Sequence, residues 1–325
     1  MTTEAIASVS ILLLCWIVLI FIDAAVSGLL YYILGISFRK AFLYGLISLC
    51  IPPLFMAYGA FIERNRFQIK EVEIVSEDLP EAFDGYRIVH ISDIHARSFK
   101  SRLNSLQRAV EKINGLDADI IAFTGDLITM SSSEIDSISH ILSTMKAEDG
   151  IVSVLGNHDY CIYADPREAG SEKDDVRNVI EKEKAMGWNI LLNENRRIAR
   201  GNDTIAVIGV ENTSPSKHFP SKGNLAKASE GTEGLFRILL SHDPMHWEME
   251  ILGKDYPLTL SGHTHAMQFS LLGWSPSRYM FKQHRGLYTE NDQHLYINIG
   301  LGETIVPARI GTVPEITLIT LKRDS

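Results

Sequence analysis

The sequence predicts a layered α/β domain over residues 67–325, preceded by a membrane anchor with two transmembrane helices in residues 1–66. Three observations support this fold class. From about residue 68, short β-branched runs alternate with helical stretches, as in α/β domains. Residues 1–62 contain only four charged side chains, Glu4, Asp23, Arg39 and Lys40. Five of the expected strands end directly in a cluster of polar side chains.

The first apolar run, Ala5–Ile22, has 18 residues. At about 1.5 Å per residue, this length is just enough to cross a hydrocarbon core of about 30 Å. Residues 24–38 either extend this helix, to about residues 5–35, or lie along the membrane interface. Asp23 is expected to contact the interface or another helix. A cleaved signal peptide is the alternative, but the first ten residues contain no Lys or Arg and a second apolar run follows.

The second run, Ala41–Ile62, has 22 uncharged residues and is expected to kink at Pro52-Pro53. The two runs together predict an integral, multi-pass protein of the cell membrane. Two basic residues lie between the runs and three follow the second one. Because these numbers are nearly equal, the positive-inside rule leaves open which side of the membrane holds the α/β domain.

Seven buried strands are expected in the soluble part: Arg87–Ser92, Asp119–Thr124, Ile151–Leu155, Thr204–Gly209, Phe236–Ser241, Leu258–Ser261 and Leu295–Ile299. Helices are expected between them over Ser101–Asn114, Glu134–Met145 and Lys173–Met186. The segments Asp159–Gly170 and Thr213–Gly231 are interrupted by Pro and Gly, so they are expected to be surface loops that rim a site.

Composition excludes several classes of protein. With 46% hydrophobic and 22% charged residues, the chain is not disordered, and three cysteines cannot form a disulfide framework. The four charges of residues 1–62 cancel, so the net charge of −9 belongs to the rest of the chain. Such an acidic domain lacks the excess of positive charge that binds a nucleic-acid backbone, so we expect no nucleic acid as a partner.

The polar clusters that follow the strands contain side chains that bind metals. They are Asp93-Ile94-His95, Gly125-Asp126, Gly156-Asn157-His158-Asp159, His242-Asp243 and Gly262-His263-Thr264-His265. Residues that follow the carboxyl ends of strands in an α/β sheet meet at one edge, where such folds place their sites. The members of each two-residue spacing, such as His263 and His265, would point the same way on extended backbone.

This set of side chains contains too many oxygen ligands for a structural zinc site. It suits a catalytic site in which Mn²⁺, Fe or Zn²⁺ keeps open coordination positions for water. It also has too many ligands for one ion, so we expect two divalent metal ions about 3.5–4 Å apart, with Asp126 as the bridge. Such a pair lowers the pKa of a bound water and holds the oxygens of a phosphorus centre. His158 is expected to protonate the leaving alkoxide, with Asp159 helping to hold its ring.

Over residues 93–265 the motifs follow the order Asp-x-His, Gly-Asp, Gly-Asn-His-Asp, His and Gly-His-x-His. This order resembles that of the calcineurin-like metallophosphoesterases. The tail around Val306–Ile316 resembles the end of the bacterial membrane-anchored branch of this family. The resemblance implies a four-layer α/β/β/α sandwich with a dinuclear centre. It assigns Asp93, His95 and His265 to one metal, and Asn157, His242 and His263 to the other. Asp126 would bridge the metals, and His158 would take the position of the catalytic histidine.

One departure from the family pattern narrows the reaction. The protein phosphatases of the family have a second Asp-Arg after Gly-Asp and a Glu after Gly-Asn-His, whereas this chain has Leu127-Ile128-Thr129 and Asp159. The pattern is similar to that of phosphodiesterases such as the UDP-2,3-diacylglucosamine pyrophosphatase-like enzymes. We therefore expect a phosphoric ester hydrolase that cleaves a phosphodiester or pyrophosphate, and the membrane anchor favours a lipid-linked substrate from lipid A synthesis.

Two other functions remain open: an anchored nucleotide or phosphoprotein phosphomonoesterase, and a non-catalytic metal-binding membrane scaffold. Five histidines outside the clusters are expected in core or surface positions: His90, His140, His218, His246 and His294. For His284 and Arg309, ordinary surface positions are favoured over a contact with substrate phosphate. Trp247 and Trp274 are expected to pack in the core or in loops. Cys161 would be redundant as a nucleophile beside a metal centre.

Overall fold

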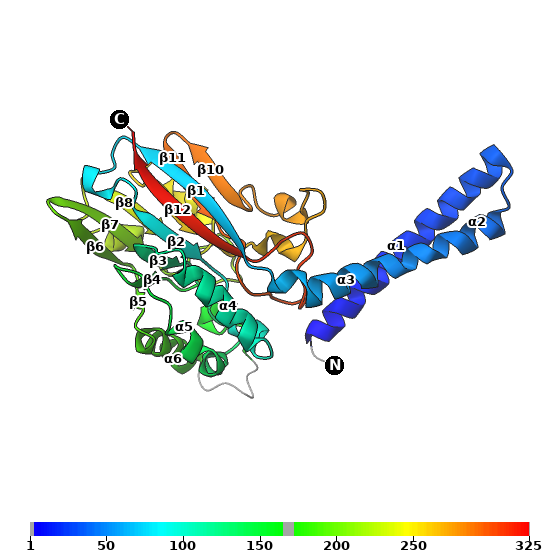
Figure 1. Ribbon diagram of the computed structural model, residues 1–325, viewed down its shortest axis with the longest axis horizontal. Helices are drawn as coiled ribbons and strands as arrows, with labels where there is room; N and C mark the ends of the chain where they lie inside the picture. The colour runs from blue at the N-terminus through cyan, green and yellow to red at the C-terminus, as the bar shows by residue number, and fades with distance from the viewer. Residues whose placement is uncertain (1–2, 165–171, 325) are drawn as a thin grey trace.

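The computed structural model describes residues 3–164 and 172–324. From residue 68 onward the chain forms two six-stranded sheets, and a pair of apolar helices projects from one end of them (Figure 1). Of the predicted loop Asp159–Gly170, residues 165–170 lie outside the described part of the chain.

The first sheet has the order β1-β12-β2-β3-β4-β5, in which β2 to β5 run parallel. Its strands are β1 (Gln68–Ser76), β2 (Arg87–Ile91), β3 (Ile120–Phe123), β4 (Ile151–Ser153), β5 (Asn189–Ile190) and β12 (Glu315–Arg323). Three helices lie along its outer face: α4 (Leu103–Asn114), α5 (Ser139–Leu142) and α6 (Glu172–Ala185) (Figure 1).

The second sheet has the order β10-β11-β9-β8-β7-β6, in which β7, β8, β9 and β11 run parallel. Its strands are β6 (Glu194–Arg200), β7 (Asp203–Gly209), β8 (Phe236–Leu240), β9 (Leu258–Ser261), β10 (Gly286–Glu290) and β11 (Gln293–Ile297). The elements on its outer face are short: α7 (Leu225–Ala228) and the single π-helical turn η7 (Trp247–Ile251).

Three apolar cores separate four layers and confirm the predicted sandwich. On β2, Val89 packs under the outer helices, whereas its neighbour Ile88 packs between the sheets. On β7, Ile205 packs between the sheets and Ala206 against the outer turns. Successive strand residues point to opposite faces, so a strand buried on both faces supplies both cores.

The seven predicted strands are confirmed, with ends that differ by at most two residues. The helix predicted over Glu134–Met145 is wrong: the chain forms a 3₁₀ segment over Ser132–Ser137 and only one turn of α5. The Glu134 carboxylate accepts hydrogen bonds from the backbone N–H groups of Thr129 and Met130. Polar side chains that bond to nearby backbone in this way compete with a regular helix.

Two apolar helices are long enough to cross a membrane by length and composition, over Ala5–Leu34 and Phe38–Asn65. The first is α1 (Thr3–Leu34), so residues 24–34 extend the first helix. The second consists of α2 (Phe38–Gly45), the 3₁₀ segment η1 (Leu46–Cys50), α3 (Ile51–Phe61) and the 3₁₀ turn η2 (Glu63–Asn65). Pro52 and Pro53 lie in the first turn of α3, where a missing N–H costs least, and the irregular segment precedes them.

The two apolar helices contact each other at Asp23. A Cβ atom on Gly45 would overlap the Asp23 carboxylate, so glycine leaves room for this side chain between the helices. The Ser27 hydroxyl lies 3.4 Å from Asp23 Oδ1, and the Trp16 indole N–H donates to the carbonyl of Leu49 at 2.8 Å. Asp23 is therefore a helix-contact residue, as expected from the sequence.

The base of α3 packs directly on the segment 300–310, which joins β11 to β12. A Cβ on Gly59 would lie 2.6 Å from the carbonyl oxygen of Arg309. Just beyond α3, the Arg64 guanidinium donates to the carbonyl of Pro307 at 3.0 Å, and Asn65 Oδ1 accepts from Arg102 at 3.1 Å. The apolar helix pair is thus attached to the sandwich by close contacts as well as by the chain itself.

Candidate metal centre

Every residue of the predicted site follows the carboxyl end of a strand. Asp93 and His95 follow β2, Asp126 follows β3, and Asn157 and His158 follow β4. From the second sheet, His242 follows β8, and His263 and His265 follow β9. The structure brings all eight side chains together where the carboxyl ends of the two sheets meet.

The first group of candidate ligands consists of Asp93, His95 and His265, all of them buried. His265 Nε2 lies 3.1 Å from Asp93 Oδ1 and 3.1 Å from His95 Nε2. His95 Nε2 lies 3.9 Å from Asp93 Oδ1. Three potential ligand atoms therefore surround one point.

The second group consists of Asp126, His242 and His263, with Asn157 beside them. His242 Nε2 lies 3.2 Å from each of three atoms: Asp126 Oδ2, Asn157 Oδ1 and His263 Nδ1. The other ring nitrogen, His242 Nδ1, donates to the carbonyl of Thr124 at 2.7 Å. This bond leaves Nε2 to face the other members of the group.

Asp126 lies between the two groups. Its Oδ2 atom is 3.7 Å from His95 Nε2 in the first group and 3.2 Å from His242 Nε2 in the second. Its Oδ1 atom accepts a hydrogen bond from the backbone N–H of His158 at 2.8 Å. No other carboxylate in the described residues is shared in this way by candidate clusters.

The backbone that presents these side chains is not extended, so the expectation of a period-two arrangement is wrong. Asp93, His95, His263 and His265 all have left-handed backbone, with φ of 50°, 45°, 73° and 48°. Backbone of this kind is uncommon outside glycine and is concentrated at functional sites. The side chains converge because each strand ends in a tight turn, not because the strands continue.

Glycines allow the turns of the first sheet to touch. Gly125 has φ +94°, and a Cβ on it would lie 2.4 Å from the backbone nitrogen of Gly156. A Cβ on Gly156 would in turn overlap the Asp126 carboxylate. The sharp turn expected before Asp126 is therefore present. Space requires glycine at both positions, and at Gly125 the backbone angle requires it as well.

His158 lies at the edge of the centre, half-buried. Its Nδ1 atom donates to the carbonyl of Thr129 at 2.7 Å, and its ring meets that of His95 edge to face at 4.8 Å. With Nδ1 occupied, Nε2 is the nitrogen available to other groups. His158 also forms a candidate ligand group with His95 and Asp126, so geometry alone allows either proton transfer or metal binding.

Asp159 does not hold the His158 ring, contrary to the expectation. Its carboxylate is fully buried and accepts backbone hydrogen bonds from Asp126 at 2.7 Å, Gly156 at 2.8 Å and Ile128 at 3.1 Å. Burial and the nearby Asp126 charge raise the pKa of Asp159 to about 7. Asp159 thus fixes the turns after β3 and β4 against each other, and Thr129 orients His158.

Arg309 is fully buried, so the expected surface position is wrong. Its guanidinium donates to the carbonyl oxygens of Ile299, Gly302 and Thr312, and Nη2 lies 3.2 Å from His265 Nδ1. The Arg309 side chain therefore connects the candidate ligand His265 to the segment that contacts α3. Sequence reasoning placed Arg309 in a distinctive tail, but nothing in that pattern indicates burial.

The other residues singled out in the sequence lie outside the clusters. His90, His246 and Trp247 are buried, and Trp274 is 42% exposed in a loop, as expected. His284 is half-buried and its backbone N–H donates to the Tyr288 hydroxyl at 3.1 Å. Cys161 is buried beside the centre, and burial raises the pKa of its thiol above the usual range, which makes it a poor nucleophile.

The donor set fits divalent cations. Burial alone would lower the pKa of His242, but the Asp126 carboxylate beside it raises the value to about 10. The charges of Asp126 and Asp93 thus favour a positive charge at a point where imidazole nitrogens converge. Imidazole and carboxylate ligands of this kind suit Zn²⁺, Fe and Mn²⁺.

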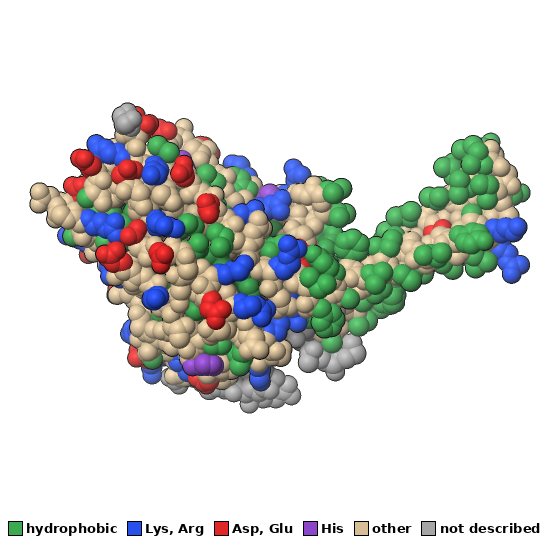
Figure 2. Space-filling model, in the orientation of Figure 1, with side chains coloured by type: hydrophobic (Ala, Val, Ile, Leu, Met, Phe, Trp, Pro, Cys, Tyr) green, Lys and Arg blue, Asp and Glu red, His purple; other side chains and the backbone are tan. Residues whose placement is uncertain are grey.

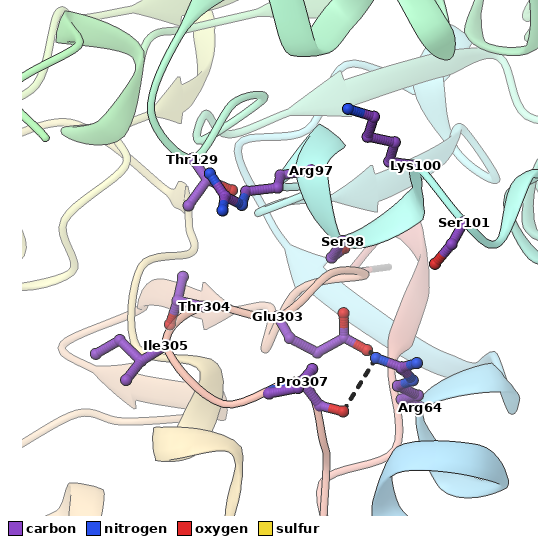
Figure 3. Close-up of a pocket in the computed structure, with 10 residues that line it drawn as sticks. All are labelled: Arg64, Arg97, Ser98, Lys100, Ser101, Thr129, Glu303, Thr304, Ile305 and Pro307. Atoms are coloured by element: carbon purple, nitrogen blue, oxygen red, sulfur yellow. Dashed lines mark hydrogen bonds and ion pairs between the residues drawn. The ribbon is translucent and has the colours of Figure 1, made fainter. Parts of the chain in front are cut away.

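A cavity of about 230 Å³ opens beside His158. Its walls include Tyr163, Met130 and Ile305, so it is partly apolar. A second cavity of about 330 Å³ adjoins it, between the segment Arg97–Ser101 and the facing Arg64, Glu303 and Pro307 (Figure 3). Together they provide a space for a ligand larger than a phosphate group.

Known proteins resemble this chain over most of its length. It is 32% identical over 300 residues to a transmembrane protein with a metallophosphoesterase domain from Danio rerio, with 88% of this chain and 64% of that protein covered. It therefore spans less than two thirds of that relative's length. An uncharacterized metallophosphoesterase of Bacillus subtilis is 29% identical over 82% of this chain and 89% of its own.

A more distant relative is a UDP-2,3-diacylglucosamine pyrophosphatase of Chlamydia trachomatis, 25% identical over 83% of this chain and 94% of its own. The model of the calcineurin-like phosphoesterases matches residues 86–267, which include every candidate ligand. This match covers more than half of the chain, and the chain therefore belongs to the calcineurin-like phosphoesterase family.

Proposed function

We propose that this chain is a membrane-anchored phosphoesterase with two divalent metal ions, which hydrolyses a phosphodiester or pyrophosphate bond. Asp93, His95 and His265 would hold one ion, Asn157, His242 and His263 the other, and Asp126 would bridge them. The observation that carries the proposal is the position of Asp126, whose Oδ2 atom lies within 3.7 Å of an imidazole nitrogen in each group.

Two ions held by these residues would supply an activated water and would neutralise the charge on the phosphoryl oxygens. The protein's own residues position the reacting groups. Thr129 holds His158 Nδ1, so Nε2 can give a proton to the leaving oxygen. Asp159 fixes the turns that carry Asp126 and Asn157, and Arg309 braces His265. Manganese, iron and zinc all suit the donor set, and metal analysis of the purified chain decides among them.

A lipid-linked substrate accords with the two apolar helices and with the pyrophosphatase of Chlamydia trachomatis among the relatives. The named candidate is UDP-2,3-diacylglucosamine, whose cleavage belongs to lipid A synthesis. Both helices crossing the bilayer would make residues 1–66 a multi-pass anchor and residues 67–325 the catalytic domain. Tethering then keeps the enzyme at the surface where such a substrate is found.

The test is hydrolysis by the full-length chain in detergent with Mn²⁺, on UDP-2,3-diacylglucosamine, bis(4-nitrophenyl) phosphate and 4-nitrophenyl phosphate. Asp126→Asn should lower kcat/KM at least about 100-fold, because an amide cannot bridge two cations as a carboxylate does. His158→Ala should lower kcat while KM changes little. His140→Ala is the matched control, because His140 is exposed.

The three substrates separate the alternatives. Preference for UDP-2,3-diacylglucosamine and bis(4-nitrophenyl) phosphate over 4-nitrophenyl phosphate supports the proposal. Release of UMP from UDP-2,3-diacylglucosamine supports that compound as the substrate. Preference for the monoester would select a phosphomonoesterase instead. Metal binding without turnover of any ester would leave a metal-binding scaffold. If His158→Ala lost a metal ion while Asp126→Asn kept both, the assigned roles would be wrong.

A further inference from the structure

Residues 267–285, here called the β9–β10 loop, form most of the connection between β9 and β10. The loop begins two residues after the candidate ligand His265. The large apolar side chains that it exposes are Met267, Leu271, Leu272, Trp274, Tyr279 and Met280. Single exposed apolar side chains are ordinary on a soluble domain, whereas several in one loop mark a surface that meets another apolar partner.

The tip of the β9–β10 loop is a tight turn with a leucine at its most exposed position. The backbone N–H groups of Leu271 and Trp274 donate to each other's carbonyl oxygens at 2.8 and 2.9 Å. Between them, Leu272 and Gly273 both have left-handed backbone, with φ of 49° and 84°. Such turns favour Asn-Gly, because a bulky apolar residue is strained at positive φ. Leu272 is also fully exposed, so packing within the domain gives no reason for a leucine at this position.

The root of the β9–β10 loop is fixed beside the base of α3. Ser270 N–H donates to the carbonyl of Ile310 at 2.7 Å, and Ile310 N–H donates to the carbonyl of Gln268 at 3.0 Å. Ile310 also meets α3, since a Cβ on Gly59 would lie 2.9 Å from Ile310 Cγ1. The loop and the second apolar helix are therefore attached to the same short piece of backbone. Figure 2 shows hydrophobic side chains that continue from the helix pair onto the adjoining part of the domain.

The composition of the β9–β10 loop suits a membrane surface. It contains no Asp or Glu, and its charged residues are Arg278, Lys282 and Arg285. Lys282 is paired with Glu248, and the Arg285 guanidinium donates to a backbone carbonyl within the loop at 2.6 Å. Because these two cations already have partners, the favourable feature is the lack of a carboxylate, which lipid phosphates would repel. Trp274 and Tyr279 are side chains of the kind enriched at membrane interfaces.

We propose that the apolar tip of the β9–β10 loop inserts into the bilayer that the two apolar helices cross. The domain then rests on the membrane at two places, the base of α3 and this loop. Both ends of the loop lie at the candidate metal centre, because His265 precedes it and the Phe281 ring packs edge to face on His263 at 5.7 Å. Insertion therefore holds the metal centre close to the lipid headgroups. This arrangement rests on the membrane anchor proposed above and goes beyond the proposed reaction.

Tryptophan fluorescence tests the insertion in the full-length chain. The chain contains four tryptophans, of which Trp188 and Trp247 are buried in the domain and Trp16 lies in α1. The emission of Trp274 is the difference between the unaltered chain and Trp274→Phe. In nanodiscs of phosphatidylcholine with one brominated acyl chain, this emission should fall at least about twofold relative to unbrominated lipid, because an interfacial indole lies within reach of the bromine.

Trp16 distinguishes failure of the anchor from failure of the loop. Trp274→Phe keeps Trp16, whose emission is quenched by brominated lipid when α1 lies in the bilayer. Quenching of Trp16 without quenching of Trp274 would overturn the inserted loop and leave the anchor intact. If neither is quenched, both are wrong. No substrate is present in this experiment, so failure of the proposed phosphoesterase reaction has no influence on either result.

Acrylamide in the aqueous phase identifies any other environment of Trp274. Quenching of Trp274 by acrylamide and not by bromine would show that the loop stays in water. Protection from both quenchers would show that a protein surface, such as a second copy of the chain, covers the loop. Either result would overturn the insertion.

Leu272→Asp separates insertion from folding. Asp tolerates left-handed backbone better than Leu does, so the Tm in detergent should not fall. The added charge should nevertheless move the tip out of the acyl chains and restore the Trp274 emission in brominated lipid. Val75→Asp is the matched control and should leave the quenching unchanged, because Val75 is also exposed but lies at the end of β1 remote from α3. Undiminished quenching in Leu272→Asp would contradict insertion of the tip.

Discussion

Glu183 is a buried carboxyl group in α6, away from the candidate ligands. Its Oε2 atom accepts a 2.5 Å hydrogen bond from the Ser153 hydroxyl, and Oε1 has no hydrogen-bond partner among the described residues. Burial, and then the charge of Asp159, raise the pKa of Glu183 well above its ordinary value. The folded state therefore holds this proton more tightly than the unfolded state does.

This shift makes stability depend on pH. The contribution of Glu183 to the free energy of unfolding is fully present below the unfolded pKa of about 4.5 and is lost as pH rises through the raised folded value. Each unit of the shift corresponds to about 1.4 kcal/mol. Glu183→Gln removes the charge, so its Tm should exceed that of the unaltered chain more at pH 8 than at pH 5.

Thermal unfolding in detergent at the two pH values measures this difference. Glu181→Gln is the matched control, because Glu181 lies on the same helix with 62% of its side chain exposed. A Tm difference for Glu183→Gln that is equal at pH 5 and pH 8 would contradict the expected ionisation.

Residue identities in the candidate site could be predicted from sequence because each ligand-type residue follows a strand that is recognisable by its apolar run. The backbone that carries them could not be predicted. The left-handed conformation of Asp93 and His263 depends on contacts between loops distant in the chain, such as the bond from His263 N–H to the Asp93 carboxylate at 3.0 Å. The roles of Asp159 and Arg309 could not be predicted from the sequence for the same reason.

At the level of elements, α3 and the segment 300–310 behave as one unit. Gly59 allows the helix to touch the backbone of Arg309, whose side chain reaches His265. Gly59→Ala would force a Cβ to within 2.6 Å of a carbonyl oxygen, and overpacking of this kind costs about 1–3 kcal/mol. We expect a lower Tm and lower phosphoesterase activity.

Gly28→Ala is the matched control, because a Cβ at this α1 position meets nothing within 4 Å. Thermal unfolding and hydrolysis of bis(4-nitrophenyl) phosphate compare the two variants. Equal behaviour of the two glycine substitutions would mean that the contact between α3 and Arg309 does not support the site.

Five strands were not predicted by the sequence analysis: β1, β5, β6, β10 and β12. β1 (Gln68–Ser76) is mostly exposed and includes three charged residues, so it lacks the continuous apolar run that identifies a buried strand, and its pairing with β12 holds it in the sheet. β12 (Glu315–Arg323) is mostly buried, and its β-branched run is a signal that could have predicted it. The short β5 and β10 lie at sheet edges, where burial imposes little pattern.

On the scale of the whole molecule, the layered fold was predictable because both sheets consist largely of apolar strands separated by helical or loop segments. The packing of one sheet on the other was not predictable, because it depends on which strands contribute side chains to the central core. The apolar helices were predictable from length and hydropathy alone. Their firm attachment to the sandwich through Arg64, Asn65 and Gly59 was not.

The helices lead to a prediction for the intact chain. Two apolar segments of 30 and 28 residues should hold it in the bilayer as an integral protein. An alkaline carbonate wash of membranes that contain the full chain should leave it in the pellet, as immunoblotting would show. Release into the supernatant would indicate peripheral attachment and contradict a spanning anchor.

The position of the cavities at the base of α3 has a consequence for kinetics. With the membrane anchor and the lipid-linked substrate proposed above, the enzyme would meet its substrate by lateral diffusion within the bilayer. The concentration that governs its rate is then the number of substrate molecules per unit of membrane area, not per unit volume. Diluting the substrate with neutral lipid slows such an enzyme even when the bulk amounts of enzyme and substrate stay constant.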